Sequence, residues 1–269
     1  MTAYYNEVDP YAAQWLRNLI TAGEIAPGDV DERDIRDIRP DELTDYSQCH
    51  FFAGIGVWSH ALRRAGWSDE RPIWTGSCPC QPFSIGGAGE GFADERHLWP
   101  HFHWLIEQCR PSVVVGEQVA SKDGLGWIDL VSADMEGTGY AFGASDLCAA
   151  GFGAAHIRQR LYWLGADTRN LGMQGQSATE GIGEGGQRGP NCALDMQQVL
   201  RSPFTPGRDW PQPLIRKGID AFAEWVGQIR AYGNALDAET ATQFCAAVIE
   251  TIDDLVAAGS NNGLNLVSL

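Results

Sequence analysis

The sequence lacks long hydrophobic runs. No stretch of about 18 consecutive apolar residues occurs, so we expect no membrane-spanning helix. The N-terminal segment 1–15 lacks Lys and Arg, so we expect no secretory signal in it. The seven cysteines are an odd number and lack the even framework of a disulfide-stapled secreted domain. These absences favour a reducing, cytoplasmic compartment.

Basic residues are also scarce. Lys and Arg total 19 against 35 Asp and Glu, which gives a formal net charge of −16. This charge excludes a protein that coats nucleic acid through charge alone. The charge is uneven, because residues 1–60 hold 11 acidic residues and four arginines, whereas residues 166–230 hold seven acidic and seven basic residues. The later region is therefore the better candidate for contacts with phosphate.

What the sequence does contain favours an α/β fold. Its 269 residues, 44% of them hydrophobic, suit one sizeable domain with or without a small second one. Strand-like runs alternate with helical patterns, which predicts a mostly parallel sheet that binds ligands at the carboxyl ends of its strands. Asp9, Pro10 and Gly23 predict the two ends of a first helix, and residues 238–257 predict a final one. Residues 171–192, rich in Gly, Gln and Ser, predict a flexible loop.

The stretch GSCPCQPFSIGG, residues 76–87, admits three interpretations: a metal pair, a redox pair or an exposed nucleophile. Only Pro79 separates Cys78 from Cys80, whereas common zinc and thioredoxin motifs have a two-residue spacer. No second Cys/His cluster stands nearby in the sequence. A loop that follows a strand at the ligand-binding edge instead favours a nucleophile, on either cysteine.

Polar residues also follow other predicted strands. Glu7 could accept ribose hydroxyls at a strand tip, or it could be a solvated surface acid. Glu117 follows three valines and is a candidate acid or base with a raised pKa, or a cap for the next turn. Arg158 and Arg160 share one side of a strand, which suits an anion or an exposed face.

Six separate segments together resemble the DNA (cytosine-5) methyltransferases. FFAGIG resembles the glycine motif that binds S-adenosylmethionine, and PCQPFS resembles the catalytic loop. GFADERHLW, EQV, IRQRLYWLG and YGNAL resemble four further motifs of the family. The resemblance implies a Rossmann-like α/β methyltransferase fold, with a mostly parallel central sheet flanked by helices and a small irregular target-recognition lobe.

The resemblance also implies a division of the chain. Residues 1–166 plus 228–269 would form the catalytic domain, and residues 167–227 the target-recognition region. The protein would be a compact methyltransferase of the phage or bacterial type, a cytoplasmic monomer without a metal. Self-protection in restriction-modification and regulation look identical in the sequence, and no nuclease motif accompanies it.

The resemblance assigns the catalytic residues. The family's nucleophile stands between Pro and Gln, so Cys80 is the match and Cys78 becomes a packing residue. Cys80 would attack C6 of a flipped cytosine in double-stranded DNA, and Glu117 would hold N3 and the exocyclic amine of the base. Arg160 would bind the base carbonyl or orient Glu117, and Arg158 would support Arg160. The alternatives are the same chemistry on RNA, as in tRNA-acting relatives, and a catalytically weakened DNA-binding relative.

The remaining assignments concern the cofactor and DNA. The residues implied to bind S-adenosylmethionine are Glu7 at the ribose, Asp34 and Ile35 at the adenine, and also Val8, Phe52, Gly54, Ile55, Gly56, Asn234 and Ala235. The residues implied to contact DNA are Pro79, Gln81, Ser84, Arg96, Arg208, Trp210, Arg216 and Lys217, although Trp210 could equally pack the small lobe.

The chain departs from the family in the order of its segments. The ribose and adenine segments normally follow the glycine turn, whereas here they precede it. We therefore predict a local permutation, in which a strand–helix–strand unit of residues 1–45 docks beside the strand of residues 48–53. This hypothesis requires Glu7 to lie close to Gly54. Val57 and Gln118 also replace the expected Gly and Asn, which leaves room for weakened catalysis.

Overall fold

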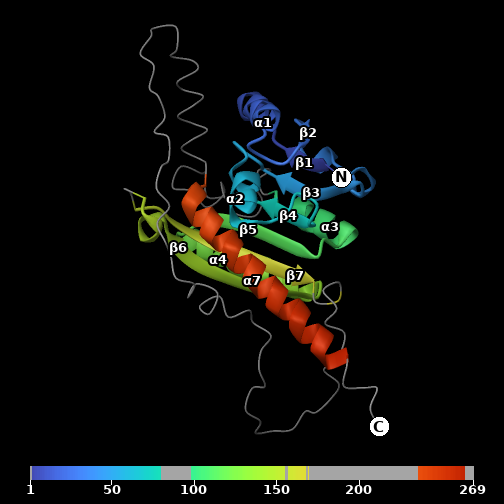
Figure 1. The fold of residues 1–269 in the computed structure, drawn as a ribbon, viewed down its shortest axis with the longest axis vertical. Coiled ribbons are helices and arrows are strands. Elements are labelled where there is room, and N and C mark those ends of the chain that lie inside the picture. The colour runs from blue at the N-terminus through green and yellow to red at the C-terminus, as the bar shows by residue number, and fades with distance from the viewer. Residues whose placement is uncertain (1, 80–97, 155–156, 168, 170–235, 264–269) are drawn as a thin grey trace.

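The computed structural model describes residues 2–79, 98–154, 157–167, 169 and 236–263 (Figure 1). Its centre is a seven-stranded sheet in the order β2-β1-β3-β4-β5-β7-β6. The strands are β1 (Thr2–Asn6), β2 (Gly28–Asp31), β3 (Tyr46–Phe51), β4 (Ile73–Gly76), β5 (Val113–Val119), β6 (Tyr140–Cys148) and β7 (Gln159–Asp167). The five strands β1 to β5 pair in parallel, and β7 runs antiparallel to both of its neighbours, β5 and β6. The mostly parallel α/β sheet is confirmed.

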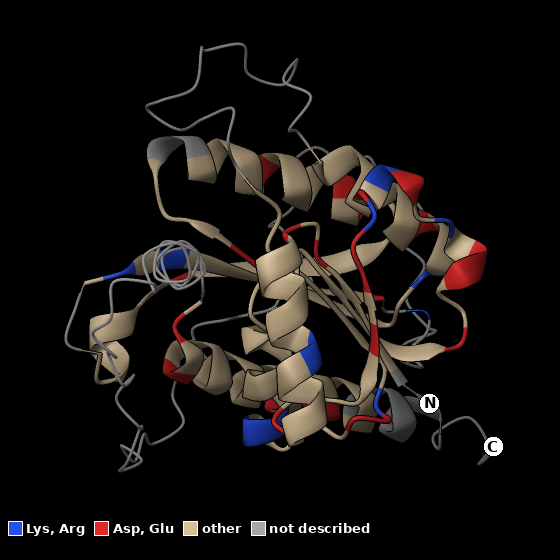
Figure 2. Ribbon diagram, turned by 90° about the horizontal axis from the view of Figure 1, so that it is seen from above, with Lys and Arg blue, Asp and Glu red and all other residues tan. Residues whose placement is uncertain are grey.

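Helices cover both faces of this sheet (Figure 2). The helices are α1 (Pro10–Ala22), α2 (Val57–Ala65), α3 (Trp99–Cys109), α4 (Lys122–Gly137) and α7 (Ala238–Gly263), with short 3-10 turns η1 (Ile35–Asp37), η2 (Pro40–Glu42) and η5 (Ala149–Phe152). None of the helices in the described ranges is long and apolar enough to cross a membrane.

Alternation along the strands divides the core between the two faces. On β5, Val114 belongs to the cluster that packs against α3 and α4, whereas Val113 and Val115 belong to the cluster that packs against α2 and α7. Successive strand residues point to opposite faces, so a buried parallel strand is apolar on both sides. The run of three valines follows from this, and it places Glu117 on the same face as Val113 and Val115.

The first helix begins and ends where the sequence predicts. The Asp9 carboxylate accepts hydrogen bonds from the backbone N–H groups of Tyr11 (2.8 Å) and Ala12 (3.2 Å), which are unsatisfied donors of the first turn. Gly23 closes the helix with a φ of 73°, a conformation that favours glycine. The helix is therefore fixed at both ends independently of its packing.

The predicted permutation is confirmed. Strands β1 and β2 come first in the chain, yet β1 pairs in parallel with β3, with Tyr4 opposite Cys49 and Asn6 opposite Phe51. The unit β1-α1-β2 therefore docks on the edge of the strand that precedes the glycine turn. As a result, the carboxyl ends of β1, β3, β4 and β5 meet at one edge of the sheet.

Candidate active site

The glycine turn after β3 forms one side of the candidate site. Phe52 and Gly54 have φ of 53° and 55°, and Gly56, the N-cap of α2, has φ of 80°. A Cβ on Gly54 would meet no atom within 4 Å, so this part of the turn is open to a ligand, whereas a Cβ on Gly56 would press on Leu16 at 3.0 Å. Val57 starts α2 in ordinary helical geometry, so a β-branched residue is tolerated where the family has a second glycine.

Glu7 ties the tip of β1 to this turn. One carboxylate oxygen accepts a hydrogen bond from the Gly54 backbone N–H at 2.7 Å, and the other accepts one from the Asp9 N–H at 2.9 Å. Burial raises the pKa of Glu7, and these two hydrogen bonds offset part of that rise. The closeness of Glu7 to Gly54 is therefore confirmed, whereas its contact with a ribose stays a prediction.

The other residues predicted to hold the cofactor differ in exposure. Val8 is 57% exposed next to Glu7, which makes it available to an apolar ring. Asp34 caps the turn η1 and pairs with Arg36 at 2.8 Å, which holds the pKa of its carboxyl below the usual value. Ile35 is only 2% exposed and packs in the core against other apolar side chains, so it offers little surface to an adenine.

Glu117 lies near the carboxyl end of β5 and is 9% exposed. Its carboxylate contacts Arg160 Nε of β7 at 2.6 Å. Burial raises the pKa of Glu117, and the positive charges of Arg160 and Arg158 act in the opposite direction. The structure therefore brings the predicted acid on β5 together with both predicted arginines, Arg160 on β7 and Arg158 just before that strand.

Gln118 connects Glu117 to the start of the catalytic loop. Its side-chain N–H donates to the Cys78 carbonyl oxygen at 3.1 Å, and its side-chain oxygen accepts a hydrogen bond from the Val119 N–H at 2.8 Å. The longer side chain thus spans from β5 to the chain after β4 without displacing Glu117 from Arg160. Cys78 itself is 3% exposed within the core, as expected of a packing residue.

Two residues near Glu117 were not among the predicted site residues. Ser77, the last residue before the CPC stretch, forms a side-chain hydrogen bond with the Glu117 carboxyl. The indole N–H of Trp58, on α2, donates to the Ser77 hydroxyl at 3.0 Å. A hydroxyl directly after a strand at the ligand-binding edge was a usable signal for Ser77, whereas nothing in the sequence singles out Trp58.

A comparison with known families decides the relationship of the chain. The C-5 cytosine-specific DNA methylase family matches residues 2–180. The chain belongs to this family. It is 34% identical over 90 residues to the type II methyltransferase M.HhaI of Haemophilus parahaemolyticus, a match that covers 32% of this chain and 28% of the relative. It is 25% identical over 159 residues to M.HaeII of Haemophilus aegyptius, covering 58% and 42%.

A solved structure gives a weaker likeness. The DNMT2 of Spodoptera frugiperda shares 14% identity with a TM-score of 0.42, over 61% of this chain and 41% of that chain. All three matches span less than half the length of the relative. The sheet order and the family match together confirm the predicted methyltransferase fold.

Several predicted site residues of this family member lie outside the described residues. They are Cys80, Gln81, Ser84, Arg96, Arg208, Trp210, Arg216, Lys217, Asn234 and Ala235. Most of the predicted target-recognition region 167–227 does so as well, and its boundaries stay a prediction. Pro79 is described and exposed. Within the described ranges, no group of three or more His, Cys, Asp or Glu residues is placed to hold a metal ion.

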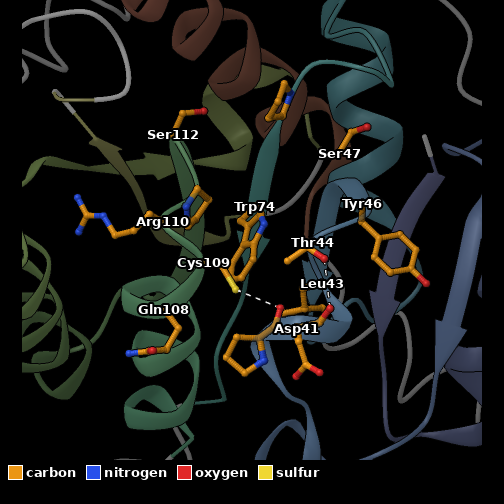
Figure 3. Close-up of a pocket in the computed structure, with 13 residues that line it drawn as sticks. Asp41, Leu43, Thr44, Tyr46, Ser47, Trp74, Gln108, Cys109, Arg110 and Ser112 are labelled. Atoms are coloured by element: carbon orange, nitrogen blue, oxygen red, sulfur yellow. Dashed lines mark hydrogen bonds between the residues drawn. The ribbon is translucent and has the colours of Figure 1, made fainter.

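A cavity of about 660 Å³ lies at the opposite, amino edge of the sheet (Figure 3). Its lining comes from the starts of β3 and β4, the end of α3 and the turn η2, and includes Tyr46, Trp74 and Cys109. The Cys109 thiol contacts the Pro40 carbonyl oxygen there. Since Glu7, Gly54 and Glu117 lie at the carboxyl edge, this cavity is not part of the candidate active site.

Proposed function

We propose that this chain transfers a methyl group from S-adenosylmethionine to C5 of cytosine in double-stranded DNA, through a covalent bond between Cys80 and C6 of the base. The observation that carries the proposal is the buried Glu117–Arg160 pair. It stands beside the chain that leads from β4 into the PCQPFS loop. The curated relatives, named as type II methyltransferases, support the same activity.

Glu117 is suited to work on the cytosine ring. A buried carboxyl group with a raised pKa retains a proton more readily than a solvated one. In its protonated form it donates a hydrogen bond to cytosine N3, while its other oxygen accepts one from the exocyclic amine. As the Cys80 thiolate adds to C6, the ring electrons move toward C5 and N3, and the proton from Glu117 neutralises the charge at N3. Arg160 holds the carboxyl group in place throughout.

The residues around the glycine turn fit the cofactor. The open side of Gly54 lets a ligand approach the backbone. Next to it, the Glu7 carboxylate can accept hydrogen bonds from hydroxyl groups of the ligand, and Val8 offers exposed apolar surface. S-adenosylmethionine, when bound there, would supply an electrophilic methyl group for C5. After Cys80 has added to C6 and C5 is methylated, loss of the C5 proton to a base expels the Cys80 thiolate, and N3 returns its proton to Glu117, which restores the aromatic ring. A flipped base is required, at a cost of a few kcal/mol.

Covalent trapping tests the proposal. A duplex with 5-fluorocytosine cannot lose a C5 proton, so the adduct should accumulate with the wild-type protein and S-adenosylmethionine, and should be visible on a denaturing gel. We expect no adduct with Cys80→Ala and an undiminished adduct with Cys78→Ser. If Cys78→Ser abolishes trapping as fully as Cys80→Ala, the nucleophile is wrongly assigned.

The trapping duplexes should carry the cytosine in sixteen contexts, which combine each of the four bases on its 5′ side with each of the four bases on its 3′ side. Bisulfite sequencing of DNA from an expressing cell would identify the site directly. An adduct on RNA but on no DNA would replace the proposed substrate with RNA. No adduct on either polymer would contradict the proposed activity.

A further inference from the structure

We propose that Ser77 is a positioning residue, held by Trp58, that orients the Glu117 carboxyl group toward the substrate base. The inference deepens the proposed function and rests on it for the role of Glu117. None of the family motifs in the sequence includes Ser77 or Trp58 as a functional residue.

The direction of the two hydrogen bonds follows from the chemistry of the groups. An indole N–H can only donate, so the Ser77 hydroxyl oxygen must accept the bond from Trp58 at 3.0 Å. The hydroxyl hydrogen is then left to point at Glu117, which accepts it. Trp58 thereby fixes the rotation of the hydroxyl group, which would otherwise turn freely.

Trp58 is itself rigidly held. It is 3% exposed and packs edge-on against Tyr162 of β7 at a ring distance of 6.0 Å and against Phe244 of α7 at 6.1 Å. Tyr162 is the direct cross-strand neighbour of Glu117 in the β5–β7 pair. The two hydrogen bonds, from Trp58 to Ser77 and from Ser77 to Glu117, thus connect the packed interface of α2, α7 and the sheet to the carboxyl group.

Two donors then define the orientation of Glu117 from different elements. Arg160 contacts the carboxylate from β7 at 2.6 Å, and Ser77 reaches it from the end of β4. A carboxyl group with one donor can still rotate about that contact, whereas two donors from separate segments of the chain fix its plane. Hydrogen bonds to an ionised group are roughly twice as strong as neutral ones, so the Ser77 bond matters most for the charged form.

The direct test is the pKa of Glu117, measured by NMR on the full chain with ¹³C-labelled glutamate and assigned with Glu117→Gln. Ser77→Ala removes a donor to the carboxylate, so the pKa should rise by about one unit. Trp58→Phe keeps an aromatic ring but loses the indole N–H, so the pKa of Glu117 should also rise, by less than in Ser77→Ala. In the double variant Ser77→Ala/Trp58→Phe the shift should equal that of Ser77→Ala alone, because both act through one path.

Ser59→Ala is the matched control. Ser59 is a buried serine on α2. Its hydroxyl lies 2.9 Å from the Tyr5 hydroxyl and accepts a hydrogen bond from the Ala26 N–H at 3.0 Å, and neither of these partners is Glu117. It should leave the pKa of Glu117 unchanged, even if the protein melts at a lower temperature. An unchanged pKa in Ser77→Ala, or an equal rise in Ser59→Ala, would overturn the inference.

Turnover gives a second readout. In Ser77→Ala we expect kcat for methyl transfer to fall about 10-fold and KM for DNA to change less than about 2-fold, because alignment of Glu117 matters for the reaction and not for binding. A loss confined to KM would contradict the positioning role. If the wild-type protein methylates no nucleic acid, the proposed function fails, whereas the NMR titration still decides whether Ser77 and Trp58 control Glu117.

Discussion

Strand β7 carries a pair of a buried carboxylate and an arginine at each of its ends, and the two pairs have the same contact distance but different surroundings. At the carboxyl edge of the parallel sheet, Glu117 contacts Arg160 at 2.6 Å. At the amino edge, Asp167 contacts Arg110, also at 2.6 Å. Both acids are buried, since Glu117 is 9% exposed and Asp167 is 1% exposed.

The surroundings of Asp167 are those of a structural pair. Arg110 donates to one carboxylate oxygen through Nη2 and through Nε at 3.1 Å, and the Arg169 backbone N–H donates to the other oxygen at 3.1 Å. Arg110 also donates to the Thr138 carbonyl oxygen at 2.7 Å and lies over the Tyr140 ring. Donors thus surround this acid, and it ties the end of α3 to β7 and to the turn before β6.

Glu117 occupies a different environment. Its pKa is raised because burial outweighs the effect of Arg160 and Arg158, and it lies next to the chain that enters the catalytic loop. Under the proposed function, a pair with the same contact distance therefore serves stability in one place and proton transfer in another. The number of donors and the position in the sheet distinguish them, and this distinction can be tested.

The largest expected effect concerns activity. Glu117→Gln removes the proton donor for N3 but keeps the shape of the side chain, so we expect the single-turnover rate of methyl transfer to fall roughly 1,000-fold. Asp167→Asn, measured in the same assay per folded molecule, should stay within about 3-fold of wild type, because that pair lies at the opposite edge. Equal losses in the two variants would show that the edges do not differ in function.

The next effect concerns stability. Asp167→Asn leaves the buried end of Arg110 without its countercharge, so the free energy of unfolding should drop by about 3 kcal/mol in urea denaturation. Arg17→Ala is the control, since it breaks an exposed pair of the same 2.6 Å distance with Glu32 and should cost no more than about 0.5 kcal/mol. If Asp167→Asn costs no more than this control, the amino-edge pair is not structural.

The sequence predicts the positions of helices, turns and motif residues better than the long-range contacts between them. The limits of α1, the glycine turn after β3 and the start of the final helix follow from local signals such as Asp9, Gly23 and the apolar period, whereas the final helix ends at Gly263, six residues beyond the predicted end. The position of β1 beside β3 was also predictable, because the ribose and adenine segments are recognisable wherever they stand. Glu117 and Arg160 could be named for the same reason.

The partners of these residues were not predictable. Ser77 follows β4, whereas Trp58 and Glu117 belong to α2 and β5, and only the packed fold brings the three residues together. Asp167 and Arg110 are 57 residues apart, and neither belongs to a motif. The antiparallel insertion of β7 between β5 and β6 likewise depends on contacts between distant parts of the chain, because the sequence of a buried strand does not indicate which strands it pairs with.

The smallest expected effect is a gain in the free energy of unfolding of Glu117→Gln. Burial raises the pKa of Glu117, so its contribution to stability is fully present below the pKa of the unfolded chain and is lost as the pH rises through the folded pKa. Glu117→Gln does not titrate, and Arg160 keeps its hydrogen bond to the Gln159 carbonyl oxygen at 2.8 Å. We therefore expect this variant to be more stable than wild type at pH 8, by on the order of 1 kcal/mol, with the gain shrinking toward pH 5. Urea denaturation at both pH values measures it, and a loss at pH 8 like that of Asp167→Asn would mean that Glu117, too, is held for stability.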